Sequence, residues 1–454
     1  MSTSIVSLNS FFELKSKIAD RSARIGVIGL GYVGLPLSLL YAAQKFPVTG
    51  FDIDERKIQA LEEGRSYIYR IPSEEVREAR AQRFTATSDF TQLSEMDAII
   101  ICVPTPLDEY KEPDMTYITG TAHAIAPHLH VGQLVILEST TYPGTTEEVL
   151  IPILENGNSH GLKAARTGTD NQTEREFYVA FSPEREDPGN TSVARADVPK
   201  VVGGLDPGAS ELAIALYGSI FTRTVRVSSP AAAEMTKLLE NIYRCVNIAL
   251  VNEIKLLCLR MGLDIWEVIN AAATKPFGFH PFYPGPGLGG HCIPVDPFYL
   301  SWKAKEWDFR TRFIELAGEI NVAMPYHVVA SVAAALNRQK KALNGARVML
   351  LGAAYKKDID DLRESPALTI IELLQKEGAL VSYNDPYIPF IGKGRKYDLQ
   401  MKSSSLEDLQ QYDCVLIVTD HSDYDYASIV DQSQLVVDSR NATNGLQSAK
   451  IVRC

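Results

Sequence analysis

One short stretch near the start of the chain restricts its fold more than any other. The residues Gly29-Leu30-Gly31-Tyr32-Val33-Gly34 have the spacing G-x-G-x-x-G and directly follow an apolar, strand-like segment, 24–28. A helix-like apolar run then continues through Leu40, and a second strand-like segment, 48–52, ends in Asp52. This order of strand, glycine turn, helix, strand and acidic residue predicts a βαβ unit that binds a dinucleotide.

The glycines and the acid of this pattern each have a physical role in such a site. Gly29 permits the tight turn, Gly31 lets the backbone approach the pyrophosphate, and Gly34 lets the helix pack on the strand. Asp52 can accept hydrogen bonds from the adenosine ribose, and its charge repels a 2′-phosphate, which favours NAD over NADP. The alternative is a glycine-rich turn beside a solvated aspartate.

Three further strand-like segments follow between residues 97 and 181, and each leads into polar residues. Thr105, Thr140 and Glu184 lie just beyond the ends of these segments. Alternating strands and helices predict a parallel sheet, and the ligands of such sheets bind beyond the carboxyl ends of the strands. We therefore expect these three side chains to line the site, although Thr and Glu are also ordinary loop residues.

The pattern becomes helical at Pro230 and stays helical until Gly262. A helix this long and apolar is expected to form the spine of a domain and a dimer contact. Lys237 and Asn241 stand four residues apart, on one face of this helix. Taken alone, they are better explained as a solvated lysine and an incidental asparagine.

A second α/β unit begins with a strand-like segment at 347–352 and echoes the first. The fingerprint glycines are replaced by Gly352-Ala-Ala-Tyr355-Lys356-Lys357, so this unit is expected to bind something other than a dinucleotide. A lysine at this turn, Lys356, suggests a phosphate partner. Arg363 and Arg440 also stand at strand or helix ends, where anions are bound.

These patterns predict an α/β protein with two Rossmann-like, doubly wound parallel-sheet domains joined by a long central helix and a helical region. The predicted divisions are an N-terminal extension (1–22), an NAD-binding Rossmann domain (23–228), a central helical domain (229–340) and a second Rossmann-like domain (341–454).

A second glycine-rich stretch, Gly285–Pro297, contains one thiol, Cys292, followed four residues later by Asp296. Glycines let a backbone approach a ligand closely, and the prolines of this stretch stiffen it. A thiol held on such a loop could be a nucleophile. For a lone cysteine, a buried and inert side chain is the usual alternative.

The composition excludes several classes of protein. Of the 454 residues, 45% are hydrophobic and 22% are charged, which is ordinary for a globular protein. The net charge of −11 argues against a nucleic-acid or anionic-membrane surface. We find no apolar run of membrane-spanning length and no signal peptide. The six cysteines show no metal-ligand spacing, so we expect reduced thiols in the cytoplasm and no metal site.

Taken together, the motifs resemble those of the UDP-glucose/GDP-mannose dehydrogenase family over nearly the whole chain. The matching segments are GLGYVG with Asp52, VPTP at 103–106, SPER at 182–185, ExxKxxxN from Glu234 to Asn241, GGHCIPVDP at 289–297, YKKDIDDLRESP at 355–366 and DSRN at 438–441. The resemblance implies an NAD domain, a helical spine that dimerises, and a second domain that binds the UDP moiety. It also implies that two NAD oxidise a sugar C6 alcohol to a carboxylate.

The same resemblance implies catalytic roles. Cys292 would attack an aldehyde as a thiolate, and the resulting thiohemiacetal would be oxidised to a thioester and hydrolysed. Lys237 would stabilise oxyanions, Asn241 would hold the sugar, and Asp296 would orient water. Glu184 would act as general base or position the water, together with Thr140.

The resemblance also implies ligand contacts. The expected NAD-binding residues are Gly29, Gly31, Tyr32, Val33, Gly34, Asp52, Lys57, Thr105, Thr140 and Arg363. The expected substrate-binding residues are Glu184, Lys237, Asn241, Tyr283, Gly289, Lys356 and Arg440. The chain departs from the family pattern at Pro188, where many members carry a second Glu whose role Glu186 could take over. It also has no match, at or beside Lys275-Pro276, for an Arg that reaches the neighbouring active site in relatives.

Within the family, the segments around Thr140, Glu184 and Cys292 are most similar to UDP-N-acetylglucosamine 6-dehydrogenases of surface polysaccharide synthesis. UDP-N-acetylmannosamine and UDP-glucose are the alternative substrates. Two other functions compete: a two-electron hydroxyacid-type dehydrogenase, which has no use for Cys292, and a catalytically inactive NAD-binding regulator. The intact set of Lys237, Asn241, Cys292 and Asp296 argues against both.

Overall fold

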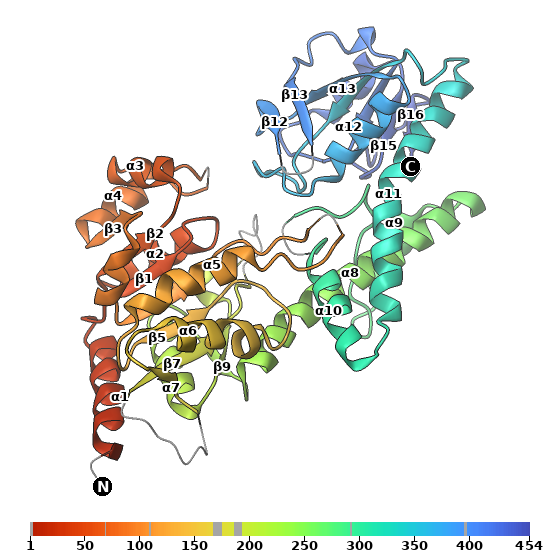
Figure 1. The fold of residues 1–454 in the computed structure, drawn as a ribbon. Coiled ribbons are helices and arrows are strands. Elements are labelled where there is room, and N and C mark those ends of the chain that lie inside the picture. Colours follow the sequence, from red (N-terminus) through yellow and green to blue (C-terminus); the bar gives the residue numbers. More distant parts are fainter. Residues whose placement is uncertain are drawn as a thin grey trace. The chain divides into compact units, whose positions relative to one another are not determined.

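The computed structural model describes residues 3–68, 70–108, 110–166, 175–185, 193–290, 293–394 and 397–454. It forms two compact units, Met1–Glu240 and Asn241–Cys454, each built around its own parallel sheet (Figure 1). The long helix α8 (Pro230–Met261) begins in the first unit and continues into the second. The predicted class of two Rossmann-like α/β sheets with a long central helix is therefore confirmed.

The first unit contains a nine-stranded sheet with the order β3-β2-β1-β4-β5-β7-β8-β9, and β6 pairs with β7. Its pairings are parallel except that between β7 and β8. The strands are β1 (Ile25–Ile28), β2 (Val48–Phe51), β3 (Phe84–Thr87), β4 (Ala98–Ile101), β5 (Leu134–Leu137), β6 (Lys163–Ala164), β7 (Glu176–Phe181), β8 (Lys200–Gly204) and β9 (Thr224–Arg226).

The antiparallel strand β8 differs from the expectation of a wholly parallel sheet. The described parts of the connection from β7, residues 182–185 and 193–199, contain a single turn of 3-10 helix, Arg195–Asp197. A parallel neighbour requires a crossover, usually a helix, to bring the chain back to the starting edge. The chain instead turns at the edge where β7 ends, and β8 runs back along it.

Helices cover both faces of this sheet, which explains the continuous apolar runs of its strands. In β4, Ala98 and Ile100 belong to one buried cluster, while Ile99 and Ile101 belong to another. The unit's helices are α1 (Thr3–Ala19), α2 (Gly34–Ala43), α3 (Glu55–Glu62), α4 (Ser73–Ala81), α5 (Thr116–Ile125), α6 (Ile151–Gly157) and α7 (Pro207–Tyr217), with the first part of α8. Helices α1, α2 and α7 contribute to the first cluster, and α5 and α6 to the second.

The second unit contains a five-stranded parallel sheet with the order β11-β10-β14-β15-β16, and a separate antiparallel pair. The sheet strands are β10 (Arg347–Leu351), β11 (Leu380–Asn384), β14 (Cys414–Ile417), β15 (Val436–Asp438) and β16 (Ile451–Arg453), and the pair is β12 (Phe390–Lys393) and β13 (Asp398–Lys402). Its helices are the rest of α8, α9 (Ile265–Ala273), α10 (Asp296–Ala304), α11 (Arg312–Arg338), α12 (Pro366–Lys376) and α13 (Tyr426–Gln432).

Helix α11 combines unusual length with an apolar composition. It is long and apolar enough, by length and composition, to cross a membrane, although we had found no apolar run of that length. Val328, Val332 and Leu336 on this helix are buried in the core of the second sheet. A buried core helix passes the same test of length and composition.

Candidate functional site

Packing within the chain requires two of the three glycines that follow β1, but not the third. Gly29 has φ +92°, and a Cβ there would lie 2.6 Å from the carbonyl oxygen of Cys102. A Cβ on Gly34 would lie 2.0 Å from the carbonyl oxygen of Gly29. At Gly31 a Cβ would meet no atom within 4 Å. Because packing explains the first two and not the third, Gly31 fits close approach by a ligand, as a pyrophosphate requires.

Asp52 is held beside this turn at the end of β2. Its carboxylate accepts hydrogen bonds from the backbone N–H groups of Leu30 (2.9 Å) and Asp54 (3.0 Å). Lys57 forms an ion pair with Asp52, with Nζ 2.8 Å from Oδ2. Lys57 therefore lies beside Asp52, the acid that is predicted to bind the ribose. Tyr32, in the turn itself, is 39% exposed.

The side chains predicted at the carboxyl ends of the strands lie in the loops that follow β4, β5 and β7. Thr105 is buried and Thr140 is half-buried. Glu184 Oε1 accepts a hydrogen bond from the N–H of Arg185 (2.8 Å), and Glu184 Oε2 lies 3.3 Å from Lys200 Nζ. Parallel register brings the ends of β4, β5 and β7 to one edge of the sheet.

Glu234, on the first turns of α8, fixes the loop that follows Thr140. Its carboxylate accepts hydrogen bonds from the N–H of Gly144 (2.6 Å), and from the N–H (2.9 Å) and hydroxyl (2.6 Å) of Thr146. Burial raises the pKa of Glu234 to about 7, against the opposing effect of these donors. Sequence analysis gave Glu234 no role beyond its place in the ExxKxxxN motif.

Further along α8, two predicted catalytic residues are buried. Lys237 is 6% exposed in the first unit, and Asn241 is 3% exposed in the second. Asn241 Nδ2 donates a hydrogen bond to Asp296 Oδ2 at 2.5 Å, and Asp296 is the first residue of α10. The structure therefore brings Asn241 and Asp296 together. The predicted nucleophile Cys292 lies outside the described residues, as do Glu186 and Pro188.

The glycine-rich loop 285–290 packs closely within the second unit. The N–H of Gly285 donates to Asn252 Oδ1 on α8 (3.0 Å), and the N–H of Gly290 donates to the carbonyl of Arg363 (3.0 Å). A Cβ on Gly289 would lie 2.5 Å from Cβ of Tyr355. Glycine at position 289 is therefore required by the chain's own packing, whatever its role toward a ligand.

This loop gathers three of the predicted anion-binding segments of the second unit. It touches the turn that carries Tyr355 and Lys356, the backbone of Arg363, and Arg440, whose Nη1 would lie 2.7 Å from a Cβ on Gly285. Arg363 pairs with Asp361 (Nη2–Oδ2, 2.6 Å), and Arg440 Nε lies 3.0 Å from Asp420 Oδ1. The Arg440 guanidinium therefore lies beside the loop, whereas Arg363 meets the loop through its backbone.

Tyr283, the other predicted substrate residue of this region, is 43% exposed. Its ring stacks on Trp266 of α9, with centroids 5.3 Å apart and planes 12° apart. Its hydroxyl donates to Asn270 Oδ1 at 2.9 Å. The stacking presents a rigid aromatic surface at the start of the loop.

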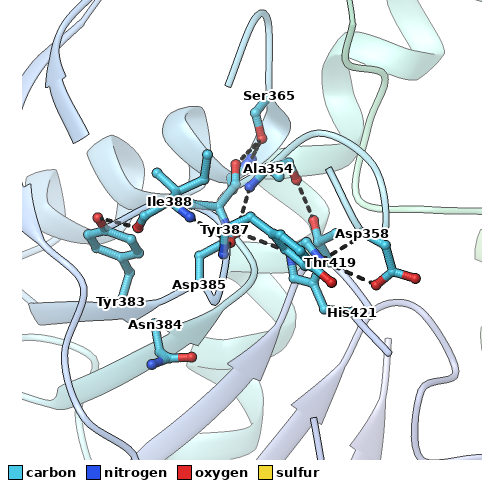
Figure 2. A network of polar contacts seen from close by, with 12 residues as sticks. Ala354, Asp358, Ser365, Tyr383, Asn384, Asp385, Tyr387, Ile388, Thr419 and His421 are labelled. Carbon is cyan, nitrogen blue, oxygen red and sulfur yellow. Dashed lines mark hydrogen bonds and ion pairs between the residues drawn. The ribbon is translucent and has the colours of Figure 1, made fainter. Parts of the chain in front are cut away.

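The second sheet repeats the arrangement of turn and acid, but its acid is fully used by the chain (Figure 2). Asp385, after β11, accepts hydrogen bonds from the N–H groups of Ala353 (2.7 Å) and Ala354 (2.9 Å) through Oδ2. Its Oδ1 accepts from the N–H groups of Tyr387 (2.8 Å) and Ile388 (3.1 Å). Because each oxygen of Asp385 already accepts at least two hydrogen bonds from the chain, no acceptor is left for a ribose.

His421, which sequence analysis missed, completes this network. Its Nδ1 accepts from the N–H of Asp358 (2.9 Å), so its Nε2 carries the proton and donates to Asp385 Oδ2 (3.0 Å). Burial alone would raise the pKa of Asp385, but His421 and the backbone donors hold it below its usual value. His421 therefore links the acid to the turn that carries Lys356. A buried histidine sixty-odd residues from this turn gives no local signal in the sequence.

Among the described residues, no group of three His, Cys, Asp or Glu side chains could hold a metal ion. The first unit offers the features of a dinucleotide site: the open backbone at Gly31, the N-terminus of α2 and the fixed carboxylate of Asp52. The second unit offers a loop beside Arg440 and the turn of Lys356, and its acid, Asp385, is already hydrogen-bonded within the chain. The two sheets are therefore suited to different ligands.

Comparisons with known proteins agree with this division. Three sequence models of the UDP-glucose/GDP-mannose dehydrogenase family match the chain: the NAD binding domain at 23–221, the central domain at 231–323 and the UDP binding domain at 349–445. A UDP-N-acetyl-D-glucosamine 6-dehydrogenase of Pseudomonas aeruginosa is 34% identical, with 89% of this chain and 92% of the relative covered.

Two further relatives carry other substrate names. An NDP-N-acetyl-D-galactosaminuronic acid dehydrogenase of Ralstonia nicotianae is 34% identical, with 94% of this chain and 96% of the relative covered. The solved structure of a UDP-D-ManNAc dehydrogenase from Pyrococcus horikoshii superimposes with a TM-score of 0.83 at 31% identity, with 95% and 98% of the two chains covered. The chain therefore belongs to the UDP-glucose/GDP-mannose dehydrogenase family and is an NAD-dependent nucleotide-sugar dehydrogenase, as its motifs predict.

Proposed function

We propose that this enzyme oxidises the C6 hydroxyl of UDP-N-acetylglucosamine to a carboxylate in two NAD-dependent steps, for surface polysaccharide synthesis. The observation that carries the proposal is the full set of three family domains together with a 34% identical UDP-N-acetyl-D-glucosamine 6-dehydrogenase. The cationic surroundings of the loop 285–290, with Lys356 and Arg440, support a diphosphate ligand in the second unit.

The proposed reaction uses this chain's residues in two stages. Bound NAD supplies the hydride acceptor in each oxidation. In the first stage, Asn241 orients the sugar, and Lys237 stabilises the negative charge on the C6 oxygen as the hydroxyl proton passes to water. The bond from Asn241 Nδ2 to Asp296 supports a shared role, since each fixes the other's direction.

In the second stage, the Cys292 thiolate adds to the C6 aldehyde, and oxidation of this adduct leaves a thioester. Glu184, aided by Thr140, takes a proton from the water that attacks the thioester carbon. The carbon–sulfur bond then breaks, the carboxylate is released and Cys292 returns as a thiolate. A covalent link to Cys292 retains the aldehyde between the two oxidations.

Stoichiometry and one substitution test this scheme. The enzyme is expected to form about two NADH per UDP-sugar consumed, whereas one NADH would leave only a two-electron dehydrogenase. Cys292→Ser is expected to slow the second oxidation and its hydrolysis by orders of magnitude, because serine is a much weaker nucleophile at neutral pH. Acid formation by Cys292→Ser at the wild-type rate would remove the thioester from the mechanism.

The choice of sugar rests on resemblance, and the relatives' names include three different N-acetylated sugars. Initial rates with UDP-N-acetylglucosamine, UDP-N-acetylmannosamine, UDP-glucose and GDP-mannose decide among them. We expect the highest kcat/KM with UDP-N-acetylglucosamine. A tenfold or greater preference for another sugar would reassign the substrate and leave the reaction type intact.

We also propose that the enzyme is a homodimer, or a higher homo-oligomer, formed through the central helix. In the second unit, α8 exposes apolar side chains at a spacing typical of a helix–helix seam. These are Tyr243, Leu250, Ile254, Leu257 and Met261, which are 37–61% exposed. Light scattering is expected to give at least twice the monomer mass, and Leu257→Glu should reduce it. The partners that we propose are a UDP-sugar and a second copy of this chain. We expect the enzyme in the cytoplasm and expect it to bind neither nucleic acid nor a membrane.

A further inference from the structure

A buried cluster of charges lies at the carboxyl edge of the first sheet, and two of its members, Lys200 and Glu138, have no role assigned above. Lys200 Nζ lies 2.9 Å from Glu138 Oε1 and 3.3 Å from Glu184 Oε2. The side chains of Lys200 and Glu138 are 2% and 0% exposed, whereas that of Glu184 is 21% exposed. One lysine thus joins an enclosed carboxylate to the partly exposed carboxylate that we propose as a base.

The antiparallel course of β8 explains how Lys200 reaches this edge. The register pairs Ala180 with Gly204 and Phe181 with Gly203. Continued along the two segments, this register sets Lys200, the first residue of β8, opposite Glu184. In a parallel strand the first residue would lie at the opposite edge, far from any ligand. The exception to the parallel sheet therefore delivers a cation to the functional edge.

Burial raises the pKa of Glu138, against the opposing effects of Lys200 and of the Tyr217 hydroxyl. The Tyr217 hydroxyl donates to Oε1 at 2.5 Å, and the Cys102 thiol lies 3.8 Å from Oε2. Burial alone would lower the pKa of Lys200, but Glu138 and Glu184 outweigh burial and raise it, so Lys200 stays charged. Two carboxylates therefore share one positive charge.

Stability is a weak reason for such a cluster. Desolvating a buried ion pair costs about as much as the pair regains, and apolar replacements are often at least as stable. Lys and Glu are almost never fully buried unless they are paired. Clusters of buried, mutually perturbed ionisable groups at a ligand-binding edge are typical of functional sites.

We propose that Lys200 and Glu138 are positioning residues for Glu184. Lys200 fixes the direction of the Glu184 carboxylate and keeps it ionised, and Glu138 withdraws part of the lysine's charge, so that Glu184 can still accept a proton from water. This proposal rests on the proposed role of Glu184 in hydrolysis. It predicts opposite effects for two changes in the cluster, which a purely structural role does not.

The test is the pH dependence of kcat with the UDP-sugar, in the full-length enzyme. Glu138→Gln leaves the whole charge of Lys200 to Glu184, so the acidic limb of the profile is expected to move to lower pH. The double variant Glu138→Gln/Lys200→Met removes the cation without leaving Glu138 as an unpaired buried charge. Its acidic limb is expected to move to higher pH, with kcat at pH 7 reduced about 10- to 100-fold.

Lys200→Arg is the matched control, because it keeps the positive charge. The acidic limb of its kcat–pH profile should therefore stay at the wild-type position. NAD titration monitors the fold of each variant. If the double variant does not fold, the test rests on Glu138→Gln, which retains Lys200. An acidic limb of Glu138→Gln at the wild-type pH then overturns the proposal. A wild-type enzyme that forms no NADH from UDP-sugars overturns the proposed function as well. Activity with unmoved limbs in both variants overturns this inference alone.

Discussion

Replacing Asp385 by Asn tests whether the acid of the second sheet serves the chain or a ligand. Each carboxylate oxygen accepts at least two N–H donors (Figure 2). An asparagine has the same shape, but one of its ends is an NH2 group that can only donate. In either orientation, at least two N–H groups of the protein then face another donor.

The expected cost follows from these contacts. A buried hydrogen bond to a charged group contributes about 1.5–3 kcal/mol, so losing two of them gives a loss of about 3–6 kcal/mol. A change of 1.4 kcal/mol corresponds to a tenfold change in the opening equilibrium of this region. Amide hydrogen exchange should therefore accelerate by about two to four orders of magnitude at Ala353, Ala354, Tyr387 and Ile388.

Asp423→Asn is the matched control. Asp423 Oδ2 accepts a hydrogen bond from the hydroxyl of Tyr387 at 3.0 Å in an exposed setting, and an asparagine oxygen can replace it. Its effect is expected to be within about 0.5 kcal/mol. Equal exchange rates in Asp385→Asn and Asp423→Asn would refute the reasoning, because the network would then carry no measurable stability.

The pH dependence of Asp385 gives an independent check. The pKa of Asp385 is lowered in the folded protein from its ordinary value of 3.8. Its contribution to stability is therefore present above pH 3.8 and is lost as the pH falls through the folded pKa. Asp385→Asn should lack this loss. The variant should also bind UDP more weakly, since Asp385 and His421 hold the turn of Lys356.

The remaining predictions concern the first unit. Gly31→Ala should leave thermal stability unchanged, because its Cβ meets no atom of the chain, while weakening NAD binding at least tenfold by fluorescence titration. Gly34→Ala should destabilise the fold itself, and equal behaviour of the two variants would contradict the distinction. The folded pKa of Glu234 is about 7 against an ordinary 4.5, so the folded form keeps a proton that the unfolded form releases. Wild-type stability should therefore fall by about 3 kcal/mol relative to Glu234→Gln between pH 4.5 and 7, as measured by urea unfolding, and a pH-independent difference would argue against it.

Much of the fold could be read from the sequence, because its signals are local. Apolar runs bounded by glycine, proline or polar residues mark β1, β4 and β5, and Pro230 and Gly262 bound α8 closely. The glycine fingerprint also follows from local chemistry, since a tight turn after a strand needs positive φ at Gly29. Family membership followed from motif order, and the comparisons confirmed it.

The candidate site was less readable wherever distant residues meet. Glycine at position 289 was expected to serve the sugar, but the structure shows that Tyr355 already excludes a side chain there. His421 and Lys200 gave no signal, since an isolated His or Lys is usually solvated and neither belongs to a recognisable motif. The apolar character of α11 was not recognised, because its apolar residues are spread among polar ones.

The sequence by itself determined the order of elements and the NAD fingerprint, because backbone geometry and residue type are local properties. Tertiary structure alone decided which charges are paired. Strand order and one antiparallel strand placed His421 on Asp385 and Lys200 between two glutamates, and the packing of helices α8 and α10 placed Asn241 on Asp296. Pairing depends on which chain segments share an edge, and no local pattern carries that information.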